Sequence, residues 1–119
     1  MEKIKIAANA FVYPMPMVIA GALTGGKVNF MAVGWVSRVN FNPPMIAVSL
    51  GNHHTNTGIH ENKEFSINIP GCDLIEKTDY VGIVSGARVD KTEIFETFYG
   101  ELKSAPMIKN CPLTMECRL

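Results

Sequence analysis

The chain has 119 residues, enough for one domain, and it combines 47% hydrophobic residues with 18% charged ones. Eleven basic and eleven acidic residues cancel, and the calculated pI is 6.8. Without a Lys/Arg cluster we expect no nucleic-acid-binding surface. No apolar run is long enough to span a membrane, and residues 1–5 do not begin a signal peptide. These properties predict a globular, cytoplasmic protein with a large core.

The cysteines also indicate a reducing compartment. There are three of them, Cys72, Cys111 and Cys117, an odd number without a CxxC motif. Cys111 and Cys117 have the same parity on a predicted strand but would lie roughly 20 Å apart along it, too far for a disulfide. We expect reduced, structural thiols, and a redox-active cysteine stays open as an alternative.

The N-terminal third of the chain predicts a hairpin. Residues 1–13 are a lead-in, with a short edge strand predicted at residues 4–8. Residues 17–23 are uniformly apolar and predict a buried strand. The sequence Thr24-Gly25-Gly26-Lys27 predicts a tight turn, because paired glycines supply positive φ angles. We therefore expect residues 17–23 to pair antiparallel with the strand that follows the turn.

That next strand is predicted over residues 28–37, followed by another over 44–50. It carries no charge before Arg38, so both faces are expected to be covered. Arg38 itself could face a phosphate or lie in solvent. One face would present Asn29, Met31, Val33, Trp35 and Ser37, and the other Val28, Phe30, Ala32, Gly34 and Val36. The distance from Asn29 to Trp35 is roughly 20 Å at strand rise, about the length of a mononucleotide with a large flat ring.

A polar loop then opens a helix predicted from Thr55 to residue 62. The first N–H groups of a helix have no internal partner and, with the helix dipole, favour an anion such as phosphate. Thr55 is predicted to be the N-cap. The loop by itself is also compatible with a plain capped helix, and on the loop alone that interpretation is favoured.

The next segments predict a strand over residues 65–69 and a second helix. Asp73 with Glu76 three residues later resembles a capping box, with Asp in the Ser/Thr position. This helix is expected to run to about Val84, with an interruption at Gly82.

The polar loop over residues 85–91 places Arg88 and Lys91 three residues apart. These cations could close over an anion, although spacing alone favours a solvated turn before a short helix at 92–95. Residues 112–119 alternate apolar and polar side chains, as a half-exposed strand does.

The histidines do not predict a metal centre. His53 and His54 are adjacent, so on an extended loop their side chains point in opposite directions, and no carboxylate or cysteine cluster joins them or His60. The chain also lacks the GxSxG, Walker A and HExxH motifs of hydrolases, nucleotide triphosphatases and zinc proteases.

Short motifs recur in a defined order through nearly the whole chain, from residue 13 to residue 118. They are NxMAxGWxSR from Asn29, NPP from Asn42, SLG from Ser49, HTNxGI from His54, FSINIP from Phe65, VSG from Val84, DK at Asp90 and CPL from Cys111. In number, order and spacing they resemble the flavin reductase-like family, nearest to its flavoredoxin-like branch.

The resemblance implies a mainly β fold: an antiparallel Greek-key split β-barrel with a few short peripheral helices. Residues 1–119 would form a single FMN-binding domain, and two subunits would pair with each FMN near their interface. Family members continue past the last strand predicted here. A fragment, a barrel completed by another chain and a reduced form of the fold all stay open.

The resemblance also implies which residues bind FMN. Along the isoalloxazine ring would lie Ala32, Val33, Gly34 and Trp35, and its edge would be closed by Ser49 and Leu50. Hydrogen bonds to the cofactor would come from Asn29 and Ser37. The residues that would hold the phosphate are His54, Thr55, Asn56 and Lys91. No side chain is expected to act as nucleophile or general base.

The implied activity is that of an FMN-dependent oxidoreductase. FMN would take electrons from NAD(P)H and pass them to an acceptor such as another protein or ferric iron. One alternative is a non-catalytic electron carrier with tightly held flavin. The other is a structural dimeric barrel that has lost its cofactor.

Overall fold

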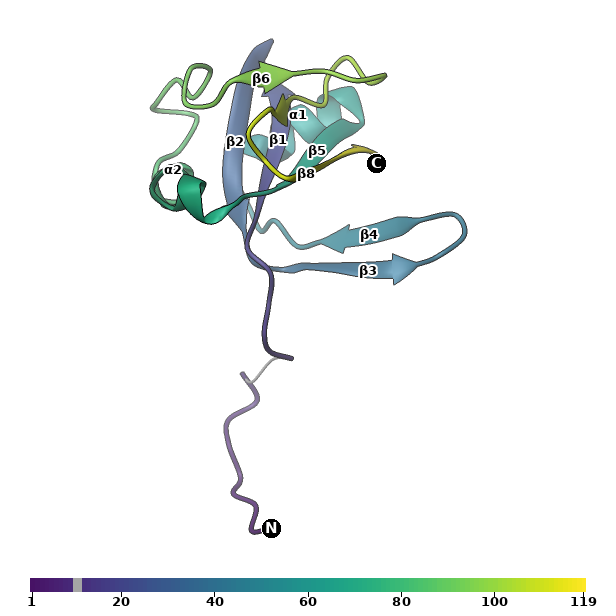
Figure 1. Cartoon of the computed structure of the whole chain (residues 1–119), viewed down its shortest axis with the longest axis vertical. Coiled ribbons are helices and arrows are strands. Elements are labelled where there is room, and N and C mark those ends of the chain that lie inside the picture. The colour runs from purple at the N-terminus through teal and green to yellow at the C-terminus, as the bar shows by residue number, and fades with distance from the viewer. Residues whose placement is uncertain (10–11) are drawn as a thin grey trace.

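The computed structural model describes residues 1–9 and 12–119, and it is mainly β (Figure 1). The elements are β1 (Val18–Thr24), β2 (Lys27–Val33), β3 (Val36–Asn40), β4 (Met45–Val48), α1 (His54–Asn62), β5 (Glu64–Ile69), α2 (Ile75–Ile83), β6 (Thr97–Phe98), β7 (Met107–Ile108) and β8 (Leu113–Arg118). The main sheet has the antiparallel order β2-β1-β5-β8, and β3–β4 and β6–β7 form separate two-stranded ribbons. The predicted mainly β, antiparallel fold with short peripheral helices is confirmed.

The predicted hairpin is confirmed in detail. Strands β1 and β2 pair from Val18 opposite Val33 to Thr24 opposite Lys27. Gly25 and Gly26 form the two-residue turn with φ angles of 58° and 76°, a conformation that side chains with a Cβ disfavour.

The single strand predicted over residues 28–37 is wrong, because the chain leaves the main sheet at Gly34 and Trp35. Strand β2 ends at Val33, and β3 begins at Val36 in a different sheet. The prediction that both faces are covered fails beyond this point, since β3 is exposed from Ser37 onward. Glycine weakens a strand interior and permits a bend. The β3–β4 ribbon therefore projects from the body (Figure 1).

Two apolar clusters lie on opposite faces of the main sheet. On one face, Met31 and Val33 pack with residues of β1, β5 and α1, and the ribbon covers part of this cluster. On the other face, Phe30 packs with Val81 of α2 and meets Phe95 edge to face, with ring centroids 5.3 Å apart. The predicted alternation of side chains therefore holds along β2 itself.

The helix starts differ from prediction. The N-cap of α1 is His53 without a side-chain cap, and Thr55 is buried inside the first turn. The residue before α2 is Leu74, also without a side-chain cap, so the predicted Asp73 capping box is wrong; Asp73 lies in a 3-10 turn. Gly82 does not interrupt α2. It lets the helix approach β2, since a Cβ there would lie 3.0 Å from the Ala32 methyl carbon.

Two further predicted elements are absent from the described residues. Residues 92–95 form turns rather than a helix, fixed in part by the Thr92 N–H donating to Asp90 Oδ1 at 2.9 Å. Residues 4–8 form no strand. The strands predicted near 65–69 and 112–119 are present as β5 and β8.

Strands β2 and β8 are the two edges of the main sheet and do not pair with each other, so the sheets of this chain do not close into a barrel. None of the helices among the described residues is both long and apolar enough to cross a bilayer.

The three cysteines are free, as expected. Burial raises the pKa of Cys111 and of Cys117 to about 11, so both thiols stay protonated near neutral pH.

The irregular segment before β7 is held by a carboxylate on β8. Glu116 accepts backbone N–H groups from Gly100, Glu101 and Leu102, each at 3.0 Å. Burial opposes ionisation of Glu116, but these three hydrogen bonds and the charge of Arg118 outweigh it and lower the pKa of its carboxyl. The ionised carboxylate is therefore the form that the fold stabilises.

Glu116→Gln is expected to reduce stability at neutral pH, because an amide is a weaker acceptor for three N–H groups. A lowered folded-state pKa contributes stability above the unfolded-state pKa, and this is lost as pH falls through the folded-state value. Urea unfolding across acidic to neutral pH should show the two proteins converging at low pH. Glu93→Gln, a change at an exposed carboxyl, is the control. Equal midpoints for wild type and Glu116→Gln at neutral pH would contradict this role.

Candidate functional site

The site is built on the free edge of β2. The two-residue turn makes Thr24 and Lys27 a hydrogen-bonded pair, and antiparallel pairs alternate from there. Phe30 and Ala32 therefore direct their N–H and C=O groups away from β1, along the edge of the sheet. Ala32 lines three adjoining hollows along this edge. The backbone groups of Ala32 are therefore available to a ligand lying along the strand.

The Lys91 side chain binds the free edge of β2 two residues before Ala32. Its side-chain Nζ donates to the Phe30 carbonyl oxygen at 2.8 Å and to the Val81 carbonyl oxygen, near the end of α2, at 3.0 Å. The residue is only 3% exposed, and burial lowers its pKa. An ammonium group has three N–H donors, so one remains for a group in the hollow that Lys91 lines.

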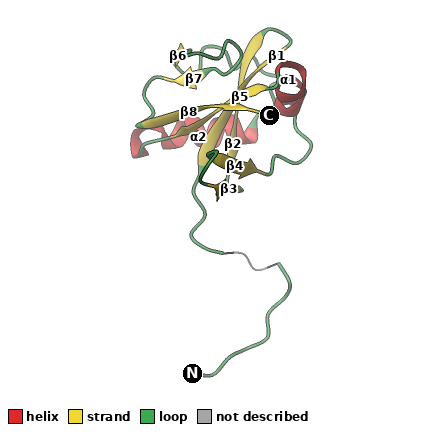
Figure 2. Cartoon of the chain, turned by 90° about the vertical axis from the view of Figure 1, so that its right-hand side faces the viewer, coloured by secondary structure: helices red, strands yellow, loops and turns green. Residues whose placement is uncertain are grey.

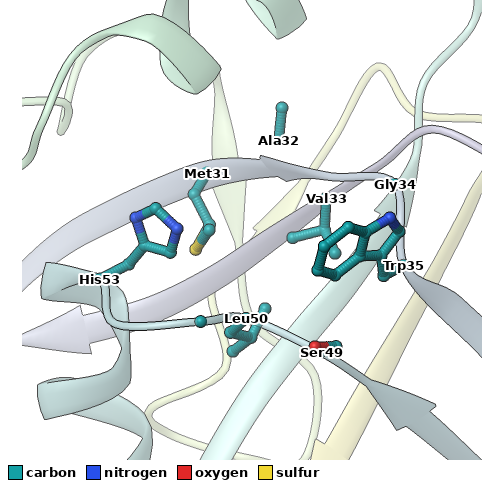
Figure 3. A pocket seen from close by; sticks show the side chains of 9 residues that line it. Met31, Ala32, Val33, Gly34, Trp35, Ser49, Leu50 and His53 are labelled. Carbon is teal, nitrogen blue, oxygen red and sulfur yellow. The ribbon is translucent and has the colours of Figure 1, made fainter. Parts of the chain in front are cut away.

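The first hollow, which we call the ring hollow, lies between the end of β2 and the loop after β4 and has a volume of about 170 Å³. Figure 3 shows the indole of Trp35 at one end, the imidazole of His53 at the other, and Leu50 between them. Its nine lining residues are Met31, Ala32, Val33, Gly34, Trp35, Ser49, Leu50, Gly51 and His53. Trp35 is 55% exposed, so part of its large flat ring surface is open to a ligand at the end of this hollow.

The second hollow, which we call the polar hollow, has a volume of about 200 Å³ and lies where α1 begins. His53, His54, Thr55, Gly86 and Lys91 are among its lining residues. It shares Met31, Ala32 and His53 with the ring hollow, so the two hollows adjoin.

The first turn of α1 faces this polar hollow. The N–H groups of His54 and Thr55 open the helix and have no carbonyl one turn earlier to bond. Thr55 Oγ1 accepts a hydrogen bond from Asn29 Nδ2 at 2.7 Å, which leaves the hydroxyl proton for another acceptor. Helix N–H groups, a hydroxyl and an ammonium group together suit an anion.

Most of the residues predicted to bind a ligand converge on these two hollows. The ring hollow contains Ala32, Val33, Gly34, Trp35, Ser49 and Leu50, and the polar hollow contains His54, Thr55 and Lys91.

The structure places the other three predicted residues elsewhere. Asn29 lies behind Thr55 as its hydrogen-bond donor. The Asn56 side chain donates to the Gly51 carbonyl at 2.5 Å and braces the loop. Ser37 lies on the exposed ribbon, with its hydroxyl donating to the Arg38 carbonyl. Direct ligand contacts by Asn29, Ser37 and Asn56 stay predictions.

Sequence reasoning missed His53, Met31 and Gly51 in the ring hollow. From the sequence, His53 is considered only as a possible metal ligand, and no cluster of His, Cys, Asp or Glu that could hold a metal occurs among the described residues. Its position one residue before the helix could have indicated a place in the site, since the residue preceding a helix N-terminus lies beside whatever that terminus binds.

The loop over residues 85–91 forms the outer wall of the polar hollow. The Arg88 and Val89 N–H groups donate to the Ser85 carbonyl, which makes a tight turn. Asp90 accepts a hydrogen bond from Thr92, which with its Lys27 partner at 3.4 Å lowers the pKa of Asp90 to about 2. Arg88 is exposed, so of the two cations predicted to close over an anion only Lys91 lines the hollow.

Both the sequence and the structure match those of known proteins. The model of the flavin reductase like domain matches residues 10–119. The structure of flavoredoxin from Methanosarcina acetivorans superposes with a TM-score of 0.94 at 57% identity, covering 100% of this chain and 64% of that one. Flavoredoxin of Desulfovibrio vulgaris (Miyazaki F) follows at 31% identity and a TM-score of 0.86, covering 98% of this chain and 67% of that one.

An uncharacterized protein from Archaeoglobus fulgidus is 30% identical over 114 residues, which are 92% of this chain and 63% of that protein. This chain therefore spans less than two thirds of the Archaeoglobus and Methanosarcina proteins and about two thirds of the Desulfovibrio protein. The matched region includes the edge of β2, the start of α1 and Lys91. The chain belongs to the flavin reductase like domain family.

Proposed function

We propose that this chain binds FMN and serves as the flavin-binding part of a flavin reductase or flavoredoxin-type oxidoreductase. The observation that carries the proposal is the meeting of the ring hollow and the polar hollow at Ala32. One offers a half-exposed indole beside the Met31 and Leu50 side chains, and the other a helix N-terminus with a buried ammonium group. FMN has the matching chemistry, a flat ring joined to a phosphate.

At the ring end, the outward N–H and C=O groups of Ala32 would hydrogen-bond the polar edge of the isoalloxazine, as a neighbouring strand would. Trp35 and Leu50 would contact its apolar surface. His53, at the junction of both hollows, would lie beside the link between ring and tail. These contacts would orient the ring and shield one of its faces from water.

At the phosphate end, the N–H groups of His54 and Thr55, the Thr55 hydroxyl and the third N–H of Lys91 would hold the phosphate. Each is a donor, and hydrogen bonds to a charged group are worth roughly 1.5–3 kcal/mol. The lysine is already fixed by Phe30 and Val81, so binding costs it little side-chain entropy.

The bound FMN would supply hydride and electron transfer between NAD(P)H and an acceptor, while the protein binds and orients it. The family name supports the nicotinamide donor, and the 57% identity to a flavoredoxin supports an electron-carrying alternative in which a redox partner protein is the acceptor. Oxidation of NAD(P)H with free FMN in excess separates the two, because only a reductase sustains turnover. We also propose a homodimer in the cytoplasm, where the three free thiols stay reduced.

Thr55→Ala is expected to weaken FMN binding by about 10-fold to 150-fold, the loss of one hydrogen bond to a charged group. Riboflavin lacks the phosphate, so its affinity should change little. Isothermal titration with both flavins in phosphate-free buffer measures this. Thr55→Ser, which keeps the hydroxyl, and Thr57→Ala, an exposed position in the same helix, are the controls. An FMN affinity that is the same in Thr55→Ala and wild type would reject the phosphate site.

Trp35 is the single tryptophan of the chain, so its fluorescence reports on the ring hollow. Both FMN and riboflavin should quench it saturably, because each carries the ring that would stack nearby. Free N-acetyltryptophanamide, titrated in parallel, corrects for light absorbed by the flavin. Calorimetric binding of FMN without quenching of Trp35 would place the ring elsewhere.

Gly86→Ala is expected to distort the lining of the polar hollow, because a Cβ at Gly86 would overlap Asn29 Oδ1. Asn29 would have to move, and its hydrogen bond to Thr55 would be lost. We expect a destabilisation of about 1–3 kcal/mol, as for other overpacked sites, and weaker FMN binding. Thermal unfolding and FMN titration measure the two effects, with the exposed Ala87→Ser as control. Wild-type values for both would show that Gly86 is not closely packed.

A further inference from the structure

A third hollow, which we call the α2 groove, lies on the opposite side of Ala32 from the ring hollow and is the largest of the three, at about 530 Å³. Its lining includes Met17, Pro70, Cys72, Ile75, Asp79 and Ile83. The helical positions 75, 79, 82 and 83 fall on one stripe of α2. Ile75 and Ile83 are 65% and 75% exposed, so this stripe presents two large apolar side chains to water.

The chain itself contains a segment with complementary chemistry. The residues before β1, which we call the N-terminal arm, are described over 1–9 and 12–17 and extend away from the body (Figure 2). Ile4 and Val12 are 82% and 90% exposed. The described residues of the arm are all exposed, and exposed apolar side chains gathered on one segment can form an interaction surface.

The order of residues in the arm matches the groove. In Lys3-Ile4-Lys5-Ile6, an extended backbone puts both isoleucines on one face and both lysines on the other. The floor of the groove is apolar, and Asp79 lies in its lining. A Cβ built at Gly71, which lines the groove, would lie 2.6 Å from Asp73 Oδ1, so Asp73 lies beside the groove as a second carboxylate. The isoleucines would then pack on the apolar floor, and the lysines would lie near the carboxylates of the groove.

The direction in which the arm leaves favours a second molecule. Met17 lies in the groove, and the arm runs from there away from α2 (Figure 1). Seventeen residues precede β1, and an extended segment of that length spans roughly 55 Å, enough to reach a neighbouring body. To occupy its own groove the arm would have to reverse direction at once.

We propose that the α2 groove receives the N-terminal arm of a second copy of this chain, with Ile4 and Ile6 against Ile75 and Ile83. Two such exchanges are related by a two-fold axis and make a closed dimer. Because Ala32 lines both the groove and the ring hollow, each arm would lie behind the strand that carries the candidate flavin site. The proposal does not depend on FMN binding.

Cys72 makes the arrangement testable by cross-linking, because it is exposed and lines the groove. Ile6→Cys should form a disulfide-linked dimer with Cys72 of the second copy under mild oxidation, seen at twice the chain mass on a non-reducing gel. Cys72→Ser in the same variant should abolish it. Val39→Cys, an exposed apolar position on the β3–β4 ribbon, is the matched control and should not link to Cys72. A link within one chain, or no link that requires Cys72, would overturn the proposal.

A second measurement does not rely on cross-linking. Light scattering over a range of concentrations should show the full chain as a dimer. The double substitution Ile4→Asp and Ile6→Asp should raise its dissociation constant at least about tenfold, and Val39→Asp should not. The described residues of the arm are exposed, so these variants should keep a folded body, which far-ultraviolet circular dichroism checks. A monomer at all concentrations, or a dimer unchanged by the aspartates, would show that the arm does not hold two copies together.

Discussion

The buried ammonium group of Lys91 joins the parts of this protein that make its site. Its hydrogen bonds to Phe30 and Val81 satisfy a carbonyl on the free edge of β2 and another near the end of α2. Both kinds of carbonyl need a donor, since a strand edge has no neighbour and the last turn of a helix has no residue to bond. One side chain therefore fixes the helix to the strand, and it places a positive charge at the bottom of the polar hollow.

The use of a lysine for this purpose has a cost, because burial disfavours the charged form and lowers its pKa. The two carbonyls and the negative end of the helix dipole offset part of that cost. An anion in the polar hollow would offset more of it. In the proposed FMN complex, the residue that stabilises the fold would also attract the phosphate.

The second constraint is the departure of the chain from the main sheet after Val33. If β2 had continued as one strand, Trp35 would have lain on the same face of the sheet as Val33. The free edge near Ala32 would also have been longer and flatter. The bend at Gly34 instead directs β3 and β4 away as a ribbon and opens the ring hollow between Trp35 and His53 (Figure 3). The same bend leaves Ala32 as the last edge residue with β-strand geometry in that hollow. A flat ring could therefore complete the strand edge with hydrogen bonds on one side and contact the indole on the other.

Sequence by itself determined the elements whose causes are local. Paired glycines at 25 and 26 require a tight turn, and the apolar runs on either side require a buried hairpin. The alternating pattern near the C-terminus requires a half-exposed strand, which is β8. The motifs also grouped most residues of the two hollows, because Ala32 to Trp35 and His54 to Thr55 are contiguous.

The tertiary structure decided what depends on distant partners: the bend after Val33, the burial of Thr55 against Asn29, the bracing role of Asn56 and the place of His53. It also decided that Lys91 reaches back across 61 residues to Phe30, because a side chain finds its hydrogen-bond partners only after the backbone has brought them within about 3 Å.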